Sequence, residues 1–141
     1  MAENHNQRRV LVADDDLMIR KMIIKVLERE GYAVEEAKDG ADAIEHCQAN
    51  SFDAILLDMM MPRIDGFHVL EWMRENRPDL IDRVLVMTAF TRTAAEQANT
   101  EIPIVFKPFD LHDLVEQVRE RVEMARNGSA APDGPESDAS I

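Results

Sequence analysis

The 141-residue chain has little cysteine and few aromatic side chains, and it lacks long apolar runs. Its one cysteine, Cys47, excludes a disulfide within the chain and is typical of a reducing compartment. No apolar run approaches the roughly 20 residues that a membrane-spanning helix needs. The polar start, Met1 to Arg9, lacks the apolar core of a signal peptide. These absences predict a cytoplasmic protein without a membrane segment.

Basic residues are also scarce, with 16 Lys and Arg against 28 Asp and Glu and a net charge of −12. A protein that binds nucleic acid carries a basic patch to neutralise phosphates, and this composition excludes nucleic acid as an expected partner. Excess negative charge keeps copies of a chain apart and favours partners with basic surfaces. We therefore expect a monomer or weak dimer that binds other proteins.

Five short apolar runs alternate with five stretches of helical periodicity, which predicts an α/β domain with a central parallel sheet. Right-handed crossovers place helices on both faces of such a sheet. The sequence predicts N-caps at Asp16 and Asp110, and a helix end at Gly31. The predicted strands are residues 10–13, 32–37 at an edge, 52–57, 84–87 and 102–106, and the predicted helices lie near 17–30, 41–49, 67–77, 91–99 and 111–122.

Composition marks the limits of the folded part. Residues 127–141 are rich in Gly, Pro, Ser, Ala and acid and have no apolar periodicity, so we expect a disordered acidic tail. Residues 1–7 are expected to be a disordered N-terminus. One folded domain over residues 8–126 remains, which is long enough for one core and too short for a second domain.

Polar groups follow the predicted strands at the points where they end. The carboxyl ends of parallel strands share one edge of the sheet, which is where open α/β sheets bind ligands. A cluster of carboxylates there needs a cation, and a lysine and a divalent metal are the candidates. The groups in question are Asp14, Asp15 and Asp16 after the first strand, Asp58 after the third, Thr88 after the fourth, and Lys107 with Pro108 after the fifth.

This ordered set resembles a response-regulator receiver domain, of which the chemotaxis regulators are the simplest members. The resemblance covers about residues 8–125, and the segment from Leu57 to Gly66, with Pro62 and Asp65, is similar to the family's phosphorylation loop. It implies a flavodoxin-like three-layer sandwich. The implied sheet has five parallel strands in the order 2-1-3-4-5, with helices on both faces.

The resemblance also implies a Mg²⁺ site. Asp15 and Asp58 would bind the ion directly, Asp14 largely through water, and Met60 through its backbone carbonyl. Mg²⁺ prefers a small number of carboxylates together with water and phosphate oxygens as ligands. The three consecutive methionines, 59–61, lack the Cys or His neighbours that a soft-metal site would need.

For phosphoryl transfer, the resemblance implies that Asp58 is the phosphoacceptor. Lys107 would neutralise charge, and Thr88 would donate a hydrogen bond to the bound phosphoryl group. The bond between Lys107 and Pro108 is implied to be cis.

The function implied is that of a stand-alone response regulator in a two-component phosphorelay. The donor would be a phosphohistidine on a histidine kinase or a histidine phosphotransfer protein, and a downstream protein would read the product. Such a protein catalyses only its own phosphorylation and dephosphorylation, and is not an enzyme with an external substrate.

Two other functions stay open. One is a protein-binding module on a receiver fold that works independently of phosphorylation. The other is a phosphatase similar to the haloacid dehalogenases, which would carry a second Asp two residues after the nucleophile, where Met60 stands.

Three features depart from the usual receiver pattern. Only 19 positions (107 − 88) separate Thr88 from Lys107, which predicts an altered fourth-helix region. The switch aromatic of the family usually lies three residues before the lysine, where this chain has Ile104. The positions two beyond Asp58 and Thr88 are the apolar Met60 and Phe90, which predicts a long-lived phosphorylated state because neither holds an attacking water.

Overall fold

The computed structural model describes residues 7–89 and 102–130, with side chains up to residue 126. The expectations for residues 1–6, for Phe90, for the helix at 91–99 and for residues 131–141 lie outside this part of the chain.

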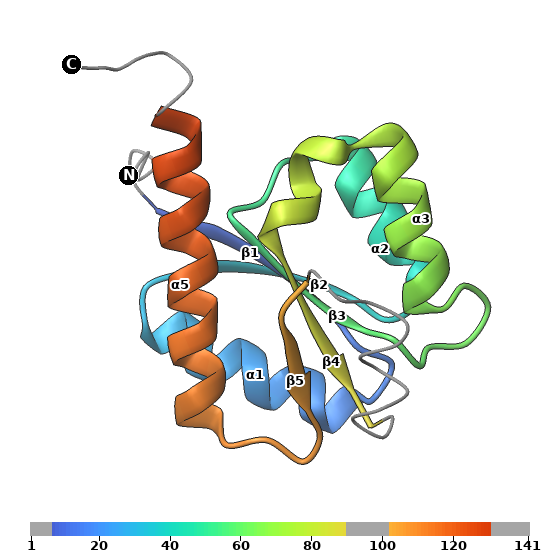
Figure 1. Ribbon diagram of the computed structural model, residues 1–141. Coiled ribbons are helices and arrows are strands. Elements are labelled where there is room, and N and C mark those ends of the chain that lie inside the picture. Colours follow the sequence, from blue (N-terminus) through green and yellow to red (C-terminus); the bar gives the residue numbers. More distant parts are fainter. Residues whose placement is uncertain (1–6, 90–101, 131–141) are drawn as a thin grey trace.

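A parallel sheet of five strands forms the centre of the molecule, in the order β2-β1-β3-β4-β5 (Figure 1). The predicted order is therefore confirmed. The central strands β1, β3 and β4 are almost wholly buried, as their continuous apolar sequences require, whereas β2 at one edge is half-buried. The strands are β1 (Arg9–Ala13), β2 (Ala33–Ala37), β3 (Ala54–Asp58), β4 (Val84–Thr88) and β5 (Ile104–Phe106).

Helices cover both faces of the sheet. Figure 1 shows α1 and α5 on one side and α2 and α3 on the other, so the predicted three-layer sandwich is confirmed. No helix among the described residues is both long enough and apolar enough to cross a bilayer. The helices are α1 (Leu17–Arg29), α2 (Gly40–Ala49), α3 (Gly66–Asn76), the 3-10 helix η1 (Pro78–Arg83) and α5 (Leu111–Ala130).

The predicted helix caps are confirmed. The Asp16 carboxylate accepts hydrogen bonds from the backbone N–H groups of Met18 (2.9 Å) and Ile19 (3.1 Å). Asp110 accepts from two N–H groups in the first turn of α5. Gly31, with φ of 97°, turns the chain after α1.

Several boundaries differ from the prediction. Helix α5 continues to Ala130, so the tail predicted to start at residue 127 is wrong for the last turn of this helix. Extending an existing helix adds one hydrogen bond per residue, which composition alone does not register. Strand β5 begins at Ile104 rather than at 102, because Pro103 has no N–H to donate to a ladder. After Pro78 the chain forms η1, which the sequence did not predict.

Candidate functional site

Three carboxylates converge at the carboxyl edge of the sheet. Asp14 follows β1 and Asp58 ends β3, and the parallel register of these neighbouring strands sets them side by side. One carboxylate oxygen from each of Asp14, Asp15 and Asp58 lies within 4.8 Å of the others. Asp14 and Asp58 are buried, with 0% and 2% of their surface exposed, whereas Asp15 is exposed. The cluster is thus open to solvent on the Asp15 side.

Lys107 reaches this cluster from the end of β5. Its Nζ donates hydrogen bonds to Asp14 Oδ2 at 2.9 Å and to Asp58 Oδ2 at 3.2 Å. Its backbone N–H donates to the carbonyl oxygen of Thr88 at 2.8 Å, which continues the pairing of β4 with β5. The bond to Pro108 is cis, as expected. From the end of β5, the lysine therefore reaches past β4 and bridges the two carboxylates at the ends of β3 and β1.

One lysine does not balance this much buried negative charge. Burial raises the pKa of the Asp58 carboxyl to about 6, and the charge of Asp14 adds to the rise. The hydrogen bond from the N–H of Met60 and the charge of Lys107 oppose it. Burial works to lower the pKa of Lys107, but hydrogen bonding to Asp14 and the charge of Asp58 outweigh it, and the net shift is upward. Lys107 therefore remains a cation, and the site keeps a net negative charge.

The donor set fits a hard divalent cation. Oxygen ligands from a few carboxylates, with room for water, suit Mg²⁺, and Asp15 lies on the side that is open to solvent. Asp14 is already engaged, since its Oδ1 accepts from the N–H of Asp16 at 2.9 Å and its Oδ2 from Lys107. Asp58 is engaged in the same way, by the N–H of Met60 and by Lys107, so the indirect role of Asp14 stays a prediction.

The remaining predicted site residues lie at the same edge. Thr88 ends β4 and is fully buried, opposite Phe106 in the strand register. Met60 lies in the loop after β3, and its N–H donates to Asp58 Oδ1 at 3.0 Å. Its side chain is half exposed. The roles of the Thr88 hydroxyl and the Met60 carbonyl stay predictions.

One buried arginine next to the site was not predicted. Arg20 in α1 donates from Nη1 to the backbone carbonyl of Asp14 at 2.7 Å and from Nε to Glu36 Oε1 at 2.7 Å. It thereby ties the end of β1 to the edge strand β2. The sequence carried a signal, because Arg20, Ile23 and Leu27 fall on one helix stripe, and all three are buried. A charged residue on an apolar stripe needs a buried partner.

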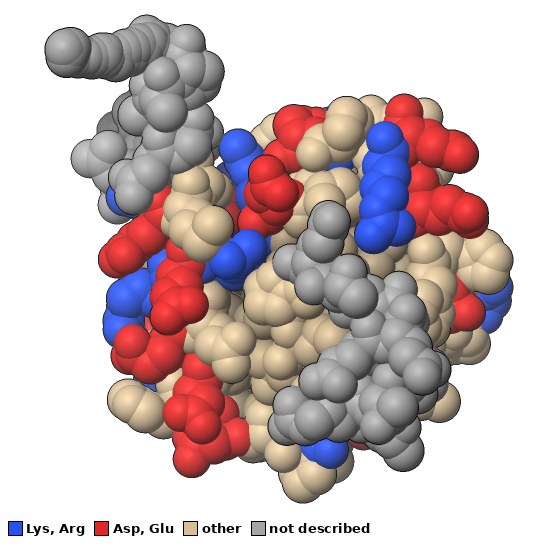
Figure 2. All heavy atoms as spheres, viewed as in Figure 1, with Lys and Arg blue, Asp and Glu red and all other residues tan. Residues whose placement is uncertain are grey.

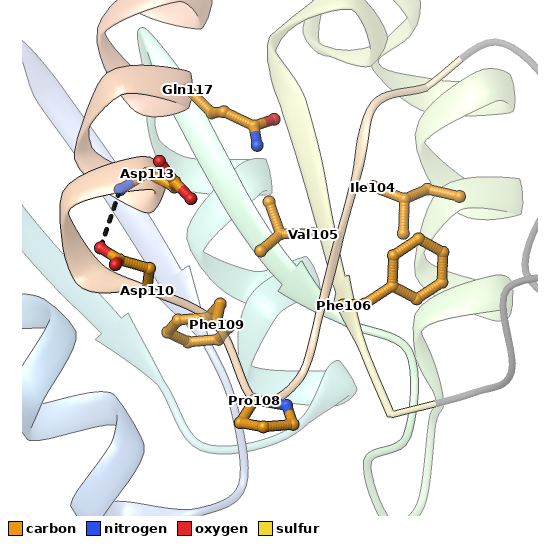
Figure 3. A pocket seen from close by; sticks show the side chains of 8 residues that line it. All are labelled: Ile104, Val105, Phe106, Pro108, Phe109, Asp110, Asp113 and Gln117. Atoms are coloured by element: carbon orange, nitrogen blue, oxygen red, sulfur yellow. Dashed lines mark hydrogen bonds between the residues drawn. The ribbon is translucent and has the colours of Figure 1, made fainter.

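A second feature is a pocket of about 310 Å³ between β5 and α5 (Figure 3). Val105 faces α5, whereas Ile104 and Phe106 lie together on the other side of the strand. Asp110 and Asp113 line its other wall, and Figure 2 shows further acidic side chains along α5. The pocket therefore combines an apolar strand with an acidic rim.

Known proteins match both the sequence and the fold. The family model described as the response regulator receiver domain matches residues 10–119. The response regulator receiver protein CpdR of Brucella abortus is 34% identical over 114 residues, which cover 79% of this chain and 93% of CpdR. The transcriptional regulatory protein ResD of Bacillus subtilis is 36% identical over 128 residues, covering 88% of this chain and 52% of ResD. The response regulator MprA of Mycobacterium sp. (strain KMS) is 34% identical over 134 residues, and this chain spans 56% of its length.

Among solved structures, a CheY-like receiver domain protein of Methanospirillum hungatei superposes with a TM-score of 0.77 at 25% identity, covering 87% of this chain and 99% of that one. The chemotaxis protein CheY4 of Vibrio cholerae gives 0.74 at 29% identity, covering 81% and 98%. The family model, the related sequences and the shared fold agree, and the chain belongs to the response-regulator receiver family.

Proposed function

We propose that this receiver accepts a phosphoryl group on Asp58, with Mg²⁺ as cofactor, from a phosphohistidine of a histidine kinase or a histidine phosphotransfer protein. The observation that carries the proposal is the Lys107 Nζ held between Asp14 and Asp58 beside the exposed Asp15. This arrangement keeps a buried carboxylate next to a fixed cation and leaves one side open to a donor.

The transfer forms a bond between an Asp58 carboxylate oxygen and phosphorus and breaks the bond between phosphorus and the imidazole nitrogen. The bonding electrons leave with the imidazole, which takes up a proton. Catalysis of such a transfer is mainly positioning and charge neutralisation. Bound Mg²⁺ supplies charge neutralisation at the phosphoryl oxygens. Lys107 contributes a second positive charge, and Thr88 donates a hydrogen bond to the transferred group.

The reaction modifies the protein itself, so the chain is a signalling protein of a two-component phosphorelay, working in the cytoplasm, rather than an enzyme with an external substrate. The match with the response regulator receiver protein CpdR, over 93% of that protein, supports a receiver function. MprA and ResD, by contrast, extend well beyond the matched receiver.

The pocket between β5 and α5 is the proposed surface for the downstream protein. Its apolar strand and the acidic Asp110 and Asp113 favour a partner segment that carries apolar and basic side chains. Phosphorylation would act on it through β5, because Thr88 pairs with Phe106 in the sheet and Phe106 lines the pocket. The partner reads a shift in the population of two conformations.

Intact mass after incubation with Mg²⁺ and acetyl phosphate tests the proposal. We expect the wild type to gain one phosphoryl group and Asp58→Asn to gain none, with EDTA preventing the gain. Asp53→Asn is a matched control, because Asp53 directly precedes the same strand at its opposite end, where it accepts from the N–H of Arg9.

The alternatives give different results in this experiment. A wild type that stays unlabelled would favour a binding module that works independently of phosphorylation. A phosphatase would release phosphate with rapid turnover, although Met60 replaces the second Asp of that class. Labelling of Asp58→Asn to the wild-type level would overturn the assignment of the acceptor.

A further inference from the structure

The loop between β3 and α3, residues 59–65, contains a strained residue close to the acid cluster. Arg63 has φ of 67° and is the one non-glycine residue with positive φ in the described part of the chain. The N–H of Ile64 donates to the carbonyl of Pro62 at 2.8 Å, which closes a tight turn around Arg63. Arginine gains nothing from this backbone conformation, so contacts outside the turn must hold it.

The first of these contacts is an ion pair with Asp39, the N-cap of α2. Arg63 Nη2 lies 2.5 Å from Asp39 Oδ2. Asp39 is only 5% exposed, and its Oδ1 accepts from the N–H of Asp42 at 2.8 Å. That backbone hydrogen bond, together with Arg63, holds the pKa of Asp39 below its ordinary value. The loop is therefore paired with a carboxylate that is charged, buried and fixed by a helix end.

The second contact lies one residue further along both segments. A Cβ on Gly40 would come within 1.8 Å of the carbonyl oxygen of Ile64, so the loop backbone rests directly on this glycine. Two adjacent residues at the start of α2, the N-cap Asp39 and Gly40, thus contact two adjacent residues of the loop, Arg63 and Ile64. The loop is positioned from outside by an ionic and a steric contact.

The other end of the loop is fixed by the site itself. The N–H of Met59 donates to the carbonyl of Met87 at 3.1 Å, and the N–H of Met60 donates to Asp58 Oδ1. The N–H of Gly66 closes the loop on the carbonyl of Met59 at 3.1 Å. Met60 therefore lies in the chain between Asp58, which its N–H contacts, and the turn at Arg63.

We infer that Asp39 and Arg63 are positioning residues that hold the β3–α3 loop in the conformation in which the Met60 carbonyl meets the Mg²⁺ bound by the acid cluster. The inference rests on the proposed function, since it assigns a role toward the same ion. Neither side chain touches the ion, and their effect passes through the loop backbone. Partners that orient ligands from outside commonly control metal affinity.

A double-mutant cycle with Mg²⁺ binding as the readout tests the inference. Asp39→Asn keeps a cap for α2 but removes the charge, and Arg63→Gln removes the guanidinium. Calorimetric titration of the unphosphorylated protein with MgCl₂ should show each single variant binding on the order of tenfold more weakly. The double variant should bind no more weakly than the weaker single variant, because both changes break one contact. Arg63→Lys should recover part of the affinity.

Arg119→Gln is the matched control, because Arg119 pairs with Glu30 at 3.0 Å between α5 and α1. It should leave Mg²⁺ affinity unchanged. Urea unfolding in EDTA identifies any variant that has simply lost stability. Variants that unfold more easily but bind Mg²⁺ as the wild type does would show a merely structural pair and overturn the inference. A wild type that binds no Mg²⁺ would instead overturn the proposed function and the inference with it.

Discussion

The two sides of the site are built differently. On the acid side, Asp14 and Asp58 stand at the ends of β1 and β3, central strands whose residues are nearly all buried. On the lysine side, Lys107 follows β5, a three-residue edge strand in which Ile104 and Phe106 are only half-buried. The acid side is held by backbone N–H donors and a buried arginine, and the lysine side by one pair of strands. The acid side is therefore built into the buried centre of the sheet, and the lysine side lies at its edge.

The two sides also differ in electrostatics. The acid side carries unfavourable charge, shown by the raised pKa of Asp58. Lys107 relieves part of it and is itself stabilised as a cation. Changes on the lysine side should therefore impair the site severely, whereas removing one charge from the acid side should stabilise the free protein.

The largest effect is expected for Lys107→Met. This change leaves two buried carboxylates without their cation and removes one charge from the transfer step. We expect labelling by acetyl phosphate to slow on the order of 100-fold. The unfolding free energy at pH 7 should fall by about 3 kcal/mol. Timed intact-mass measurements and urea unfolding in EDTA provide the two values.

Lys25→Met is the control for this change, because Lys25 is exposed on α1. A Lys107→Met variant that labels at the rate of Lys25→Met would show that the acid side works without the lysine.

Asp58→Asn should have the opposite effect on stability in the absence of metal. The ordinary pKa of the carboxyl is 3.8 and that in the fold is about 6, so the stability contributed by its protonated form is complete below about pH 4 and is lost as pH rises through 6. Asparagine does not titrate. The unfolding free energy of the variant should exceed that of the wild type by about 2–3 kcal/mol at pH 7, and the difference should vanish near pH 4.

Urea unfolding in EDTA across pH 4 to 8 checks this, and saturating Mg²⁺ should shrink the difference because the ion stabilises the wild type. A wild type more stable than Asp58→Asn at pH 7 in EDTA would contradict the claim that the ionised acid side destabilises the metal-free protein.

The sequence predicted the strand-end groups on both sides of the site better than the contacts that hold them in place. Strand ends and N-caps depend on local signals, so Asp58 and the caps Asp16 and Asp110 could be placed from the pattern. Pairings between distant segments carry no such signal. The contact of Arg63 with Asp39 links residues 24 positions apart, and nothing local distinguishes Arg63 from a solvated loop residue.

Strand β5, on the lysine side, shows a second limit of prediction from the sequence. The apolar run from 102 to 106 predicted a longer strand, but Pro103 shortens it. The orientation of Ile104 and Phe106 relative to α5 depends on the register with β4, which sequence periodicity does not determine.

A smaller effect is expected for Met60→Asn. Met60 is 52% exposed beside the acceptor, and a polar amide there would help to hold the water that attacks the phosphoryl group. We expect the phosphorylated form to decay faster by roughly tenfold or less. Mass spectrometry of the decaying protein measures the rate. Met124→Asn is the control, since Met124 on α5 is also 52% exposed, and decay at the same rate in both variants would remove Met60 from control of the lifetime.

The smallest effect is expected for deletion of residues 131–141. This segment carries Asp133, Glu136 and Asp138 and no basic residue, so its removal only lowers the net negative charge. Helix α5 is packed on the domain by residues that precede this segment. Val122 and Ala125 are buried, and Arg126 Nε lies 3.4 Å from Asp53 Oδ1. Thermal unfolding and labelling by acetyl phosphate should therefore match those of the full chain. A second deletion, from residue 127, also removes the last turn of α5. Comparing the two deletions separates the effect of that turn from the effect of residues 131–141. If loss of 131–141 alone slows labelling, the segment acts on the site, and the comparison of the acid side with the lysine side would have to include it.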